Sequence, residues 1–309
     1  MPAPNHSADD RALHLWQALA DADGLPPAWL ADAVQYVAPL ANRLAERHAT
    51  QPQPLVVGIN GAQGTGKSTL AKALALMLET RFSLKTTALS LDDFYLGHAA
   101  RQHLSQTVHP LLATRGVPGT HDIALALATV QSLRSSHGIV ALPAFDKASD
   151  DCVAESARRH TSAPRDVIIL EGWCIGVCPQ TDAALTEAVN TLETQEDTDG
   201  RWRHYVNDCL AADYQALFAN IDYLVMLKAP DFDCVLEWRS LQETKLADRL
   251  KAQNHDGTRI MSADAIARFI QHYERLTRHG FATLPERADT TFYLDTNHRI
   301  CDQNHRAYQ

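Results

Sequence analysis

Residues 61–68, which read GAQGTGKS, constrain this chain more than any other stretch. They fit the pattern G-x-x-x-x-G-K-[ST], the signature of a phosphate-binding P-loop. The apolar run 55–60 comes before them and is typical of a buried strand. After them, Leu70, Leu74 and Met77 recur at helical spacing. A glycine-rich turn can match the pattern by chance, but a strand before it and a helix after it form the context that a P-loop requires.

The chemistry expected of this loop follows from its geometry. Glycines let the backbone turn sharply and approach phosphate, because no Cβ stands in the way. Successive N–H groups then point inward, and the following helix presents its positive end to the anion. We expect Lys67 to reach the β- and γ-phosphates of ATP and to act in transfer, and the Ser68 hydroxyl to hold Mg²⁺. The loop residues expected to bind the nucleotide are Gly61, Gln63, Gly64, Thr65, Gly66, Lys67, Ser68 and Thr69.

Length, composition and charge narrow the class of protein. The chain has 309 residues, 45% of them hydrophobic, which suits one large α/β domain or two smaller ones and argues against global disorder. A formal net charge of −9 argues against a nucleic-acid or anionic-membrane surface. No apolar run approaches membrane-spanning length, and the first ten residues lack the apolar region of a signal peptide. We therefore expect a cytoplasmic protein with a small-molecule substrate, and the oligomeric state stays open.

The cysteines and histidines show no metal-binding array. Of the six cysteines, only Cys174 and Cys178 lie close together, and no second pair completes a zinc pattern. The fifteen histidines are dispersed and form no H-E-x-x-H motif. Reduced thiols, as in a cytosolic protein, are the expected state.

Helical and strand-like patterns alternate along the chain. Residues 11–48 show two apolar helical stripes with a break at 24–27, and 51–54 form a short linker. A polar stretch, 97–110, is expected to be a loop over the site. Expected strands are 55–60, 86–91, 139–142, 167–170, 223–227 and 291–294. Expected helices are 68–78, one beginning at Ile123, a mainly helical region 182–219 with a break near 196–200, then 232–250 and 266–276.

This alternation predicts an α/β fold, in which a mostly parallel sheet carries helices on both faces. With the P-loop, it is the fold of a P-loop NTPase or kinase. The predicted division is an N-terminal helical extension, 1–50, and a kinase domain, 51–309, with lid helices at about 231–280.

Ligands of such sheets bind at the carboxyl ends of the strands. Besides the P-loop, Asp92, Asp146 and Glu171 are each expected to follow a strand at that edge. Glu171 is expected to bind Mg²⁺ as a Walker-B carboxylate, although it could be a strand-end acid that faces solvent. Asp92 is expected to be the catalytic base and a metal ligand, with Asp93 on the opposite strand face. A solvated Asp92–Asp93 pair is the alternative.

Several further side chains are candidates for binding the acceptor or closing the site. Asp122 could instead cap a helix, and Asp146 with Lys147 could be a surface ion pair. Arg239 could reach the phosphates from a lid helix or could simply be solvated. The tryptophans Trp173, Trp202 and Trp238 are expected to be packing residues. The residues expected to contact the acceptor are Asp93, Tyr95, Arg115, His121, Asp122, Asp146 and Lys147.

Residues 90–95, SLDDFY, resemble the S-x-D-x-F-Y element of uridine kinase and its relatives, phosphoribulokinase and pantothenate kinase. In that element the first Asp is the base, which corresponds to Asp92. Further stretches resemble the D-glycerate 3-kinase family of plants, fungi and bacteria over roughly residues 50 to 300. One stretch differs, since 148–152 reads ASDDC where eukaryotic members have a glycine-rich segment that ends in Asp-Arg. The matching stretches are 115–122, 142–147, 200–203 with 206–207, 238–239 with 242–243, and 269–277.

The resemblance implies a kinase that uses ATP and Mg²⁺ to convert D-glycerate to 3-phosphoglycerate. Arg115, His121 and Lys147 are suited to clamp such a small carboxylate. Two alternatives stay open. The acceptor could be another small alcohol or hydroxy acid, as in pantothenate or uridine kinases. The chain could also be a non-catalytic ATP-binding regulator, although a regulator would not need carboxylates such as Asp92 and Asp146 beside an acceptor pocket.

Overall fold

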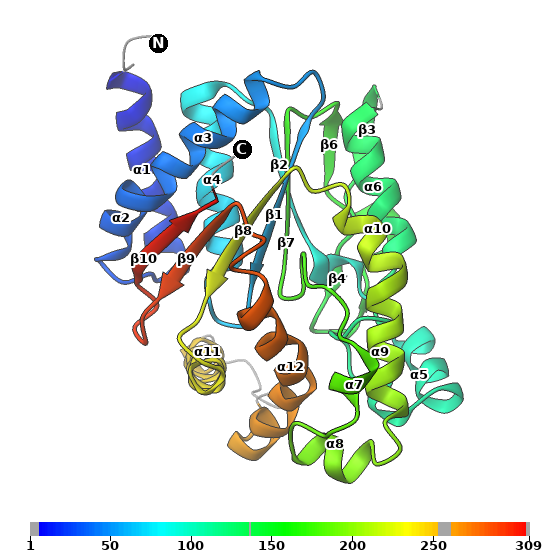
Figure 1. The fold of residues 1–309 in the computed structure, drawn as a ribbon. Helices are drawn as coiled ribbons and strands as arrows, with labels where there is room; N and C mark the ends of the chain where they lie inside the picture. Colours follow the sequence, from blue (N-terminus) through cyan, green and yellow to red (C-terminus); the bar gives the residue numbers. More distant parts are fainter. Residues whose placement is uncertain (1–5, 136, 253–260, 307–309) are drawn as a thin grey trace.

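The computed structural model describes residues 6–135, 137–252 and 261–306. A six-stranded sheet in the order β10-β9-β8-β1-β7-β2 runs through the molecule, with helices on both faces (Figure 1). Every neighbouring pair is parallel except β9 and β10, which are antiparallel. The mostly parallel sheet is therefore confirmed. Its strands are β1 Leu55–Gly61, β2 Thr86–Ser90, β7 Val167–Gly172, β8 Tyr223–Lys228, β9 Thr290–Leu294 and β10 Ile300–His305.

The register of the central strands places the ends of three strands together at one edge of the sheet. Strands β1 and β7 are buried along their whole length, which explains their nearly unbroken apolar sequences. Asn60 pairs with Gly172, and Ser90 of β2 pairs with Glu171. The carboxyl ends of β1, β2 and β7 thus lie side by side, so the P-loop, the residues after Ser90 and the Glu171 carboxylate converge.

The helices follow the predicted order, apart from an additional helix at His98–Thr107. Their bounds are α1 His6–Asp23, α2 Trp29–Asp32, α3 Ala38–Ala49, α4 Lys67–Phe82, α5 His98–Thr107, α6 Ile123–Ser135, α7 Asp182–Leu185, α8 Thr191–Glu196, α9 Arg201–Cys209, α10 Gln215–Phe218, α11 Phe232–Ala252 and α12 Ala263–Thr283. π-helical turns at Ala33–Val37 and Leu210–Tyr214 join α2 to α3 and α9 to α10. None of the helices in the described ranges has the length and apolarity needed to cross a membrane.

The N-terminal helices pack against the helix that follows the P-loop (Figure 1). The Trp16 side chain is fully buried, and its indole N–H donates to the Ala73 carbonyl of α4 at 2.9 Å. Lys72 of α4 also forms an ion pair with Asp23 at 2.9 Å. The helices predicted within 11–48 and their break at 24–27 are present, whereas a domain boundary at residue 50 stays a prediction.

One local prediction is wrong, and two others are correct only in part. The expected loop 97–110 contains helix α5, where Arg101 is buried rather than exposed. The strand expected at 139–142 is β3, Gly138–Ala141, which pairs antiparallel with β6, His160–Ala163, in a separate two-stranded sheet. The second strand ends at Ser90, and a 3₁₀ turn, Leu91–Phe94, follows it. Strand β10 was not expected, because its sequence is mostly polar and largely exposed.

Candidate active site

The P-loop joins the end of β1 to the start of α4, as expected. Gly64 and Gly66 have φ angles of +82° and +89°, which residues with a side chain rarely adopt. A Cβ on Gly64 would also lie 2.7 Å from Trp238 Cβ of α11, so this glycine allows α11 to approach the loop. The strand, glycine turn and helix that a phosphate site needs are therefore all in place.

Lys67 begins α4 and is the cation of the P-loop. Its ammonium donates to the Ala62 carbonyl at 3.1 Å. Burial lowers the pKa of Lys67, while the negative charges of Glu171 and Asp92 act in the opposite direction. Both carboxylates are thus close enough to interact with this ammonium, which connects the phosphate side of the site to the end of β2.

Ser68 and Glu171 form a ready pair of oxygen ligands. The Ser68 hydroxyl donates to Glu171 Oε1 at 2.7 Å, and the Glu171 side chain is buried. The segment after β7 is fixed because the Asn60 amide donates to the carbonyls of Trp173 and Ile175. Mg²⁺ prefers oxygen ligands and keeps several waters. Two adjacent protein oxygens beside a P-loop fit that preference.

The Asp92 carboxylate is held from two sides. Tyr95 donates its hydroxyl proton to Asp92 Oδ1 at 2.8 Å, and Lys147 Nζ lies 2.6 Å from Asp92 Oδ2. Burial alone would raise the pKa of Asp92, but the charge and hydrogen bond of Lys147, the hydrogen bond of Tyr95 and the charge of Lys67 together lower it. Asp92 is therefore an anion throughout the neutral pH range.

Asp93 has a different environment from its neighbour. Burial and the nearby charge of Asp92 raise the pKa of Asp93, although backbone hydrogen bonds with Phe145 and Ser90 act against the rise. Both residues lie in the 3₁₀ turn, so the predicted alternation on a strand does not apply. They are distinguished instead by their partners, since Asp92 has side-chain partners and Asp93 is held by backbone groups.

The buried side chain of Arg101 stabilises the loop that carries Lys147 and Asp150. Arg101 of α5 donates to the carbonyls of Leu96 and Ala113, and it binds both the carbonyl and the carboxylate of Asp150. The other carboxylate oxygen of Asp150 binds the Arg115 guanidinium. The guanidinium groups of Arg101 and Arg115 share the single carboxylate of Asp150, so this cluster of three side chains has a net charge of +1. Arg101 was not predicted as a site residue, because Ala113 and Asp150 are distant from it in the chain.

Two of the predicted acceptor residues have local structural roles. The Asp146 carboxylate accepts from the N–H groups of Ala148 and Ser149 and so stabilises a hairpin turn. It lies on the short strand β4, Phe145–Asp146, rather than at the edge of the main sheet as predicted, because β3 does not join that sheet. Asp122 accepts from the Leu125 N–H at 2.9 Å and caps α6, which was the alternative considered for it.

His121 is buried, and its imidazole packs on Tyr95 with ring centroids 4.7 Å apart. Burial lowers the pKa of His121 to about 4, so the ring is neutral at pH 7 rather than a cation. The Gly119 N–H donates to the Tyr214 hydroxyl oxygen, which lies 2.5 Å from His121 Nδ1. We assign the phenol proton to that contact. His121 Nδ1 then accepts, and Nε2 carries the imidazole proton.

His121 Nε2 has no hydrogen-bond partner among the described residues. The Nε2–H group is therefore a buried hydrogen-bond donor near Asp92, and it could donate to an oxygen atom of a ligand. Tyr214, which orients it, lies in a π-helical turn, and such turns are frequent at functional sites. No local sequence pattern identified Tyr214.

Arg239 lies on α11 above the same region. Its guanidinium is 2.7 Å from Glu243, one helical turn further on, and stacks over the Phe269 ring at 6.0 Å. The charges of Asp92, Arg115 and Arg239 all act on the buried Tyr273 phenol. Tyr273 donates to the Arg115 carbonyl at 3.0 Å, so α12 contacts the loop that carries Arg115, which is named the acceptor loop after the binding role predicted for Arg115. Contact between Arg239 and phosphate stays a prediction.

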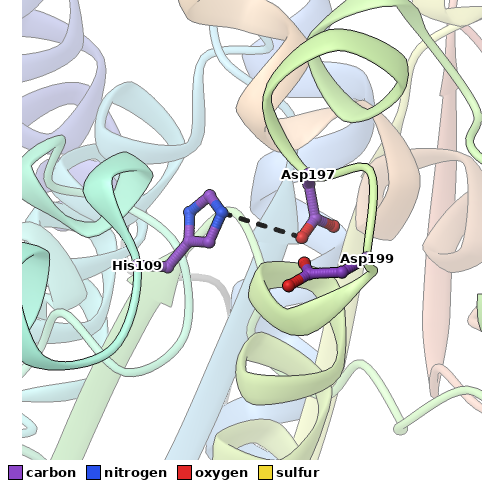
Figure 2. Close-up of side chains that lie close together, drawn as sticks. All are labelled: His109, Asp197 and Asp199. Atoms are coloured by element: carbon purple, nitrogen blue, oxygen red, sulfur yellow. Dashed lines mark ion pairs between the residues drawn. The ribbon is translucent and has the colours of Figure 1, made fainter.

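A second cluster of metal-type side chains comprises His109, Asp197 and Asp199 (Figure 2). The side chains of His109 and Asp197 already have hydrogen-bond partners within the protein. Asp197 accepts from the N–H of Trp202 and from the Arg203 guanidinium, and His109 Nδ1 accepts from a backbone N–H. With Nδ1 as acceptor, Nε2 of neutral His109 carries the proton and is not free to ligate a metal. The cluster therefore caps helix α9 and joins it to the loop before Pro110.

A cavity of about 850 Å³ opens beside the P-loop. Gly64 and Thr69 line it, whereas Asp92 and Lys147 are not among its described lining residues. The Asp92 carboxylate, which interacts with Lys67, therefore lies outside the described lining of this cavity.

Fold and site together define a P-loop kinase, an enzyme that transfers phosphate to an alcohol. No family model matches the chain. It is 32% identical over 246 residues to the uncharacterized kinase mug58 of Schizosaccharomyces pombe, covering 74% of this chain and 82% of the other. It is 30% identical over 229 residues to the chloroplastic D-glycerate 3-kinase of Arabidopsis thaliana, covering 71% of this chain and 46% of the plant protein.

A solved structure agrees with these relatives. D-glycerate 3-kinase from Cryptococcus neoformans superposes with a TM-score of 0.71 at 28% identity, covering 88% of this chain and 99% of the other. The chain belongs to the glycerate 3-kinase family of P-loop kinases. The fold class and the family resemblance predicted from the sequence are therefore confirmed.

Proposed function

We propose that the protein transfers the γ-phosphoryl group of ATP to the terminal hydroxyl of D-glycerate and forms 3-phosphoglycerate. The observation that carries the proposal is the Asp92 carboxylate, held between Tyr95 and Lys147 and within electrostatic reach of Lys67. A non-catalytic nucleotide-binding protein has no need of such an anion between the P-loop and a cationic loop. The two family relatives named D-glycerate 3-kinase support the choice of acceptor.

In the proposed reaction, the acceptor hydroxyl donates a hydrogen bond to Asp92. The hydroxyl oxygen forms a bond to the γ-phosphorus as the bond from that phosphorus to the β,γ-bridging oxygen breaks, so ADP leaves. The hydroxyl proton passes to Asp92 late, because the transition state is loose, and Asp92 mainly orients the oxygen in line. Lys67 compensates the negative charge of the phosphoryl oxygens as it shifts to the leaving group.

Mg²⁺ bound with ATP would compensate further phosphate charge. Ser68 and Glu171 are the residues that would hold it, directly or through water, because their oxygens already lie together at 2.7 Å. Asp92 is less suited to metal binding than predicted, since both of its oxygens have protein partners.

The acceptor carboxylate would bind on the loop side of Asp92. Arg115 and Lys147 supply positive charge there, and the buried Nε2–H of His121 supplies a neutral donor. Arginine and lysine bind carboxylates through charge-assisted hydrogen bonds. This arrangement suits a small anion better than an uncharged nucleoside.

The proposal extends to location and partners. A net charge of −9 and cysteines that are all free, wherever the structure describes them, suit a cytoplasmic enzyme with a small-molecule substrate. The same net charge does not favour nucleic acid or an anionic membrane as partner.

A coupled ADP-release screen tests the acceptor. Purified protein with Mg²⁺ and ATP would be offered D-glycerate, L-glycerate, pantothenate, uridine and ribulose 5-phosphate. D-glycerate is expected to give the highest kcat/KM. Rapid turnover of uridine or pantothenate with none of D-glycerate would disprove the acceptor assignment and leave the kinase class intact.

A further inference from the structure

Part of the wall of the cavity beside the P-loop comes from the N-terminal helices, which were not predicted to contribute to the site. Gly64, Thr65 and Thr69 form its phosphate end, and Trp238 of α11 forms one side. Another part of the lining comes from the N-terminal helices and includes Trp29 and Asp32. The N-terminal helices, which lie outside the predicted kinase domain, are thus part of the cavity that begins at the phosphate loop.

A single turn connects all of these walls. The turn 295–299 between β9 and β10 is closed by Asp295, whose carboxylate accepts from the N–H groups of Asn297 and Arg299. Trp238 donates to the Thr296 carbonyl at 3.0 Å, and the His298 ring stacks on Trp238 at 4.1 Å. The turn therefore fixes the lid side of the cavity from within the sheet.

The same turn reaches the N-terminal helices through an ion pair. Arg299 Nε and Nη2 lie 3.0 and 2.6 Å from the two carboxylate oxygens of Asp32, in a bidentate arrangement. The Asp32 side chain is 9% exposed and that of Arg299 is 47% exposed. Bidentate pairing fixes direction as well as distance, so Asp32 sets the position of the turn relative to α2.

We propose that the end of α1, α2 and the π-helical turn after α2 form the outer wall of the pocket for the nucleotide base and ribose, and that the Asp32–Arg299 pair is a positioning pair that sets the width of this pocket. The inference rests on the proposed use of ATP as phosphoryl donor. Phosphates fixed over the P-loop leave the cavity as the space into which the adenosine can extend. Its size and its lining by Trp29, Val37 and Leu227 suit the faces of a purine.

The role of the N-terminal helices follows. They are held against α4 by Trp16 and by the Asp23–Lys72 ion pair, so the wall is fixed to the helix that carries Lys67 and Ser68. A change at Asp32 should loosen only the far wall, where the base would lie, and leave the phosphate loop as it is. Asp32 and Arg299 are thus expected to affect nucleotide affinity without touching the reacting atoms.

Calorimetric titration of the full-length protein with ATP and with inorganic tripolyphosphate distinguishes binding at the phosphate loop from binding at the far wall of the cavity. Tripolyphosphate has no base and reports the P-loop alone. Asp32→Asn and Arg299→Gln should each weaken ATP binding by about 5- to 20-fold, the loss of a charged hydrogen-bonded pair, and change tripolyphosphate binding less than about twofold. The double variant should be no worse than the weaker-binding single variant.

Two further measurements complete the test. Arg268→Gln removes an exposed ion pair with Glu196 and should leave both affinities unchanged. The KM for ATP should rise in the Asp32 and Arg299 variants while kcat at saturating ATP stays within about twofold. Unchanged ATP affinity in both single variants would overturn the proposal, as would equal weakening of ATP and tripolyphosphate. Because binding is measured without an acceptor, failure of D-glycerate as substrate would leave this test unaffected.

Discussion

The Lys147 ammonium lies 2.6 Å from the Asp92 carboxylate, so the proposed base is paired with a cation that an anionic acceptor would also need. Lys147 comes from the loop after β4 and is 60% exposed, whereas Asp92 follows β2. An exposed pair of this kind contributes little to stability. Its position between the P-loop and the acceptor loop therefore points to a role in binding and catalysis.

Lys147→Gln should weaken acceptor binding and change the pH profile. Loss of a charge-assisted hydrogen bond is expected to raise the KM for the acceptor by about 10- to 100-fold. Because Lys147 lowers the pKa of Asp92, its removal should raise that pKa and move the acid limb of kcat/KM to higher pH. Steady-state kinetics from pH 4.5 to 8 measure both effects. Lys85→Gln, a change at an exposed position just before β2, serves as control, and equal profiles for the two variants would contradict the role of Lys147.

Ser68→Ala should raise the Mg²⁺ requirement. The variant removes an oxygen that lies 2.7 Å from Glu171 Oε1 and leaves the P-loop backbone intact. The half-saturating concentration of free Mg²⁺ at fixed ATP should increase by about 10-fold or more. Ser135→Ala, which alters an exposed hydroxyl at the end of α6, should keep the wild-type value. An unchanged requirement in Ser68→Ala would place the metal elsewhere.

His121 should make the fold sensitive to acid. Its pKa in the folded protein is about 4, below the ordinary 6.5, because burial disfavours the charged ring. Between these values the unfolded chain binds more protons, so this contribution to the free energy of unfolding is full above pH 6.5 and is lost as pH falls toward 4. The loss should approach about 3 kcal/mol, at 1.36 kcal/mol per pH unit.

Urea unfolding at pH 7 and pH 4.5 tests the prediction. The wild type should lose more stability between the two values than His121→Asn does, by about 2 kcal/mol or more. His103→Asn, an exposed position on α5, should retain the wild-type difference. The same loss in His121→Asn as in the wild type would show that the imidazole is not buried and neutral.

The parts of this fold with strong local signals were predictable from the sequence. The P-loop, the fully buried strands β1 and β7 and the amphipathic helix α12 have patterns that long-range contacts only reinforce. Helix α5 was not predictable in the same way. Its sequence is polar, and its helical packing depends on Arg101, an ordinarily exposed residue that is buried because carbonyls and Asp150 surround it.

The candidate site was predictable to a similar extent. Lys67, Ser68, Asp92 and Glu171 could be placed together because parallel strands end at one edge. The acceptor loop could not, since Arg115 and Asp150 pair across 35 residues without any periodic pattern. Tyr214 acts on His121 from 93 residues away, and only the folded chain shows it.

In the proposed reaction, phosphate passes from ATP on the P-loop to an acceptor hydroxyl bound by Asp92. A single-turnover comparison of Asp92→Asn with Asp93→Asn tests it most directly, because Asn keeps the shape and one acceptor oxygen but cannot take the proton. Asp92→Asn should slow transfer by roughly 10²- to 10⁴-fold with ATP affinity little changed, and Asp93→Asn should cost much less. The reverse ranking, or near-wild-type transfer in Asp92→Asn, would show that Asp92 is not the base.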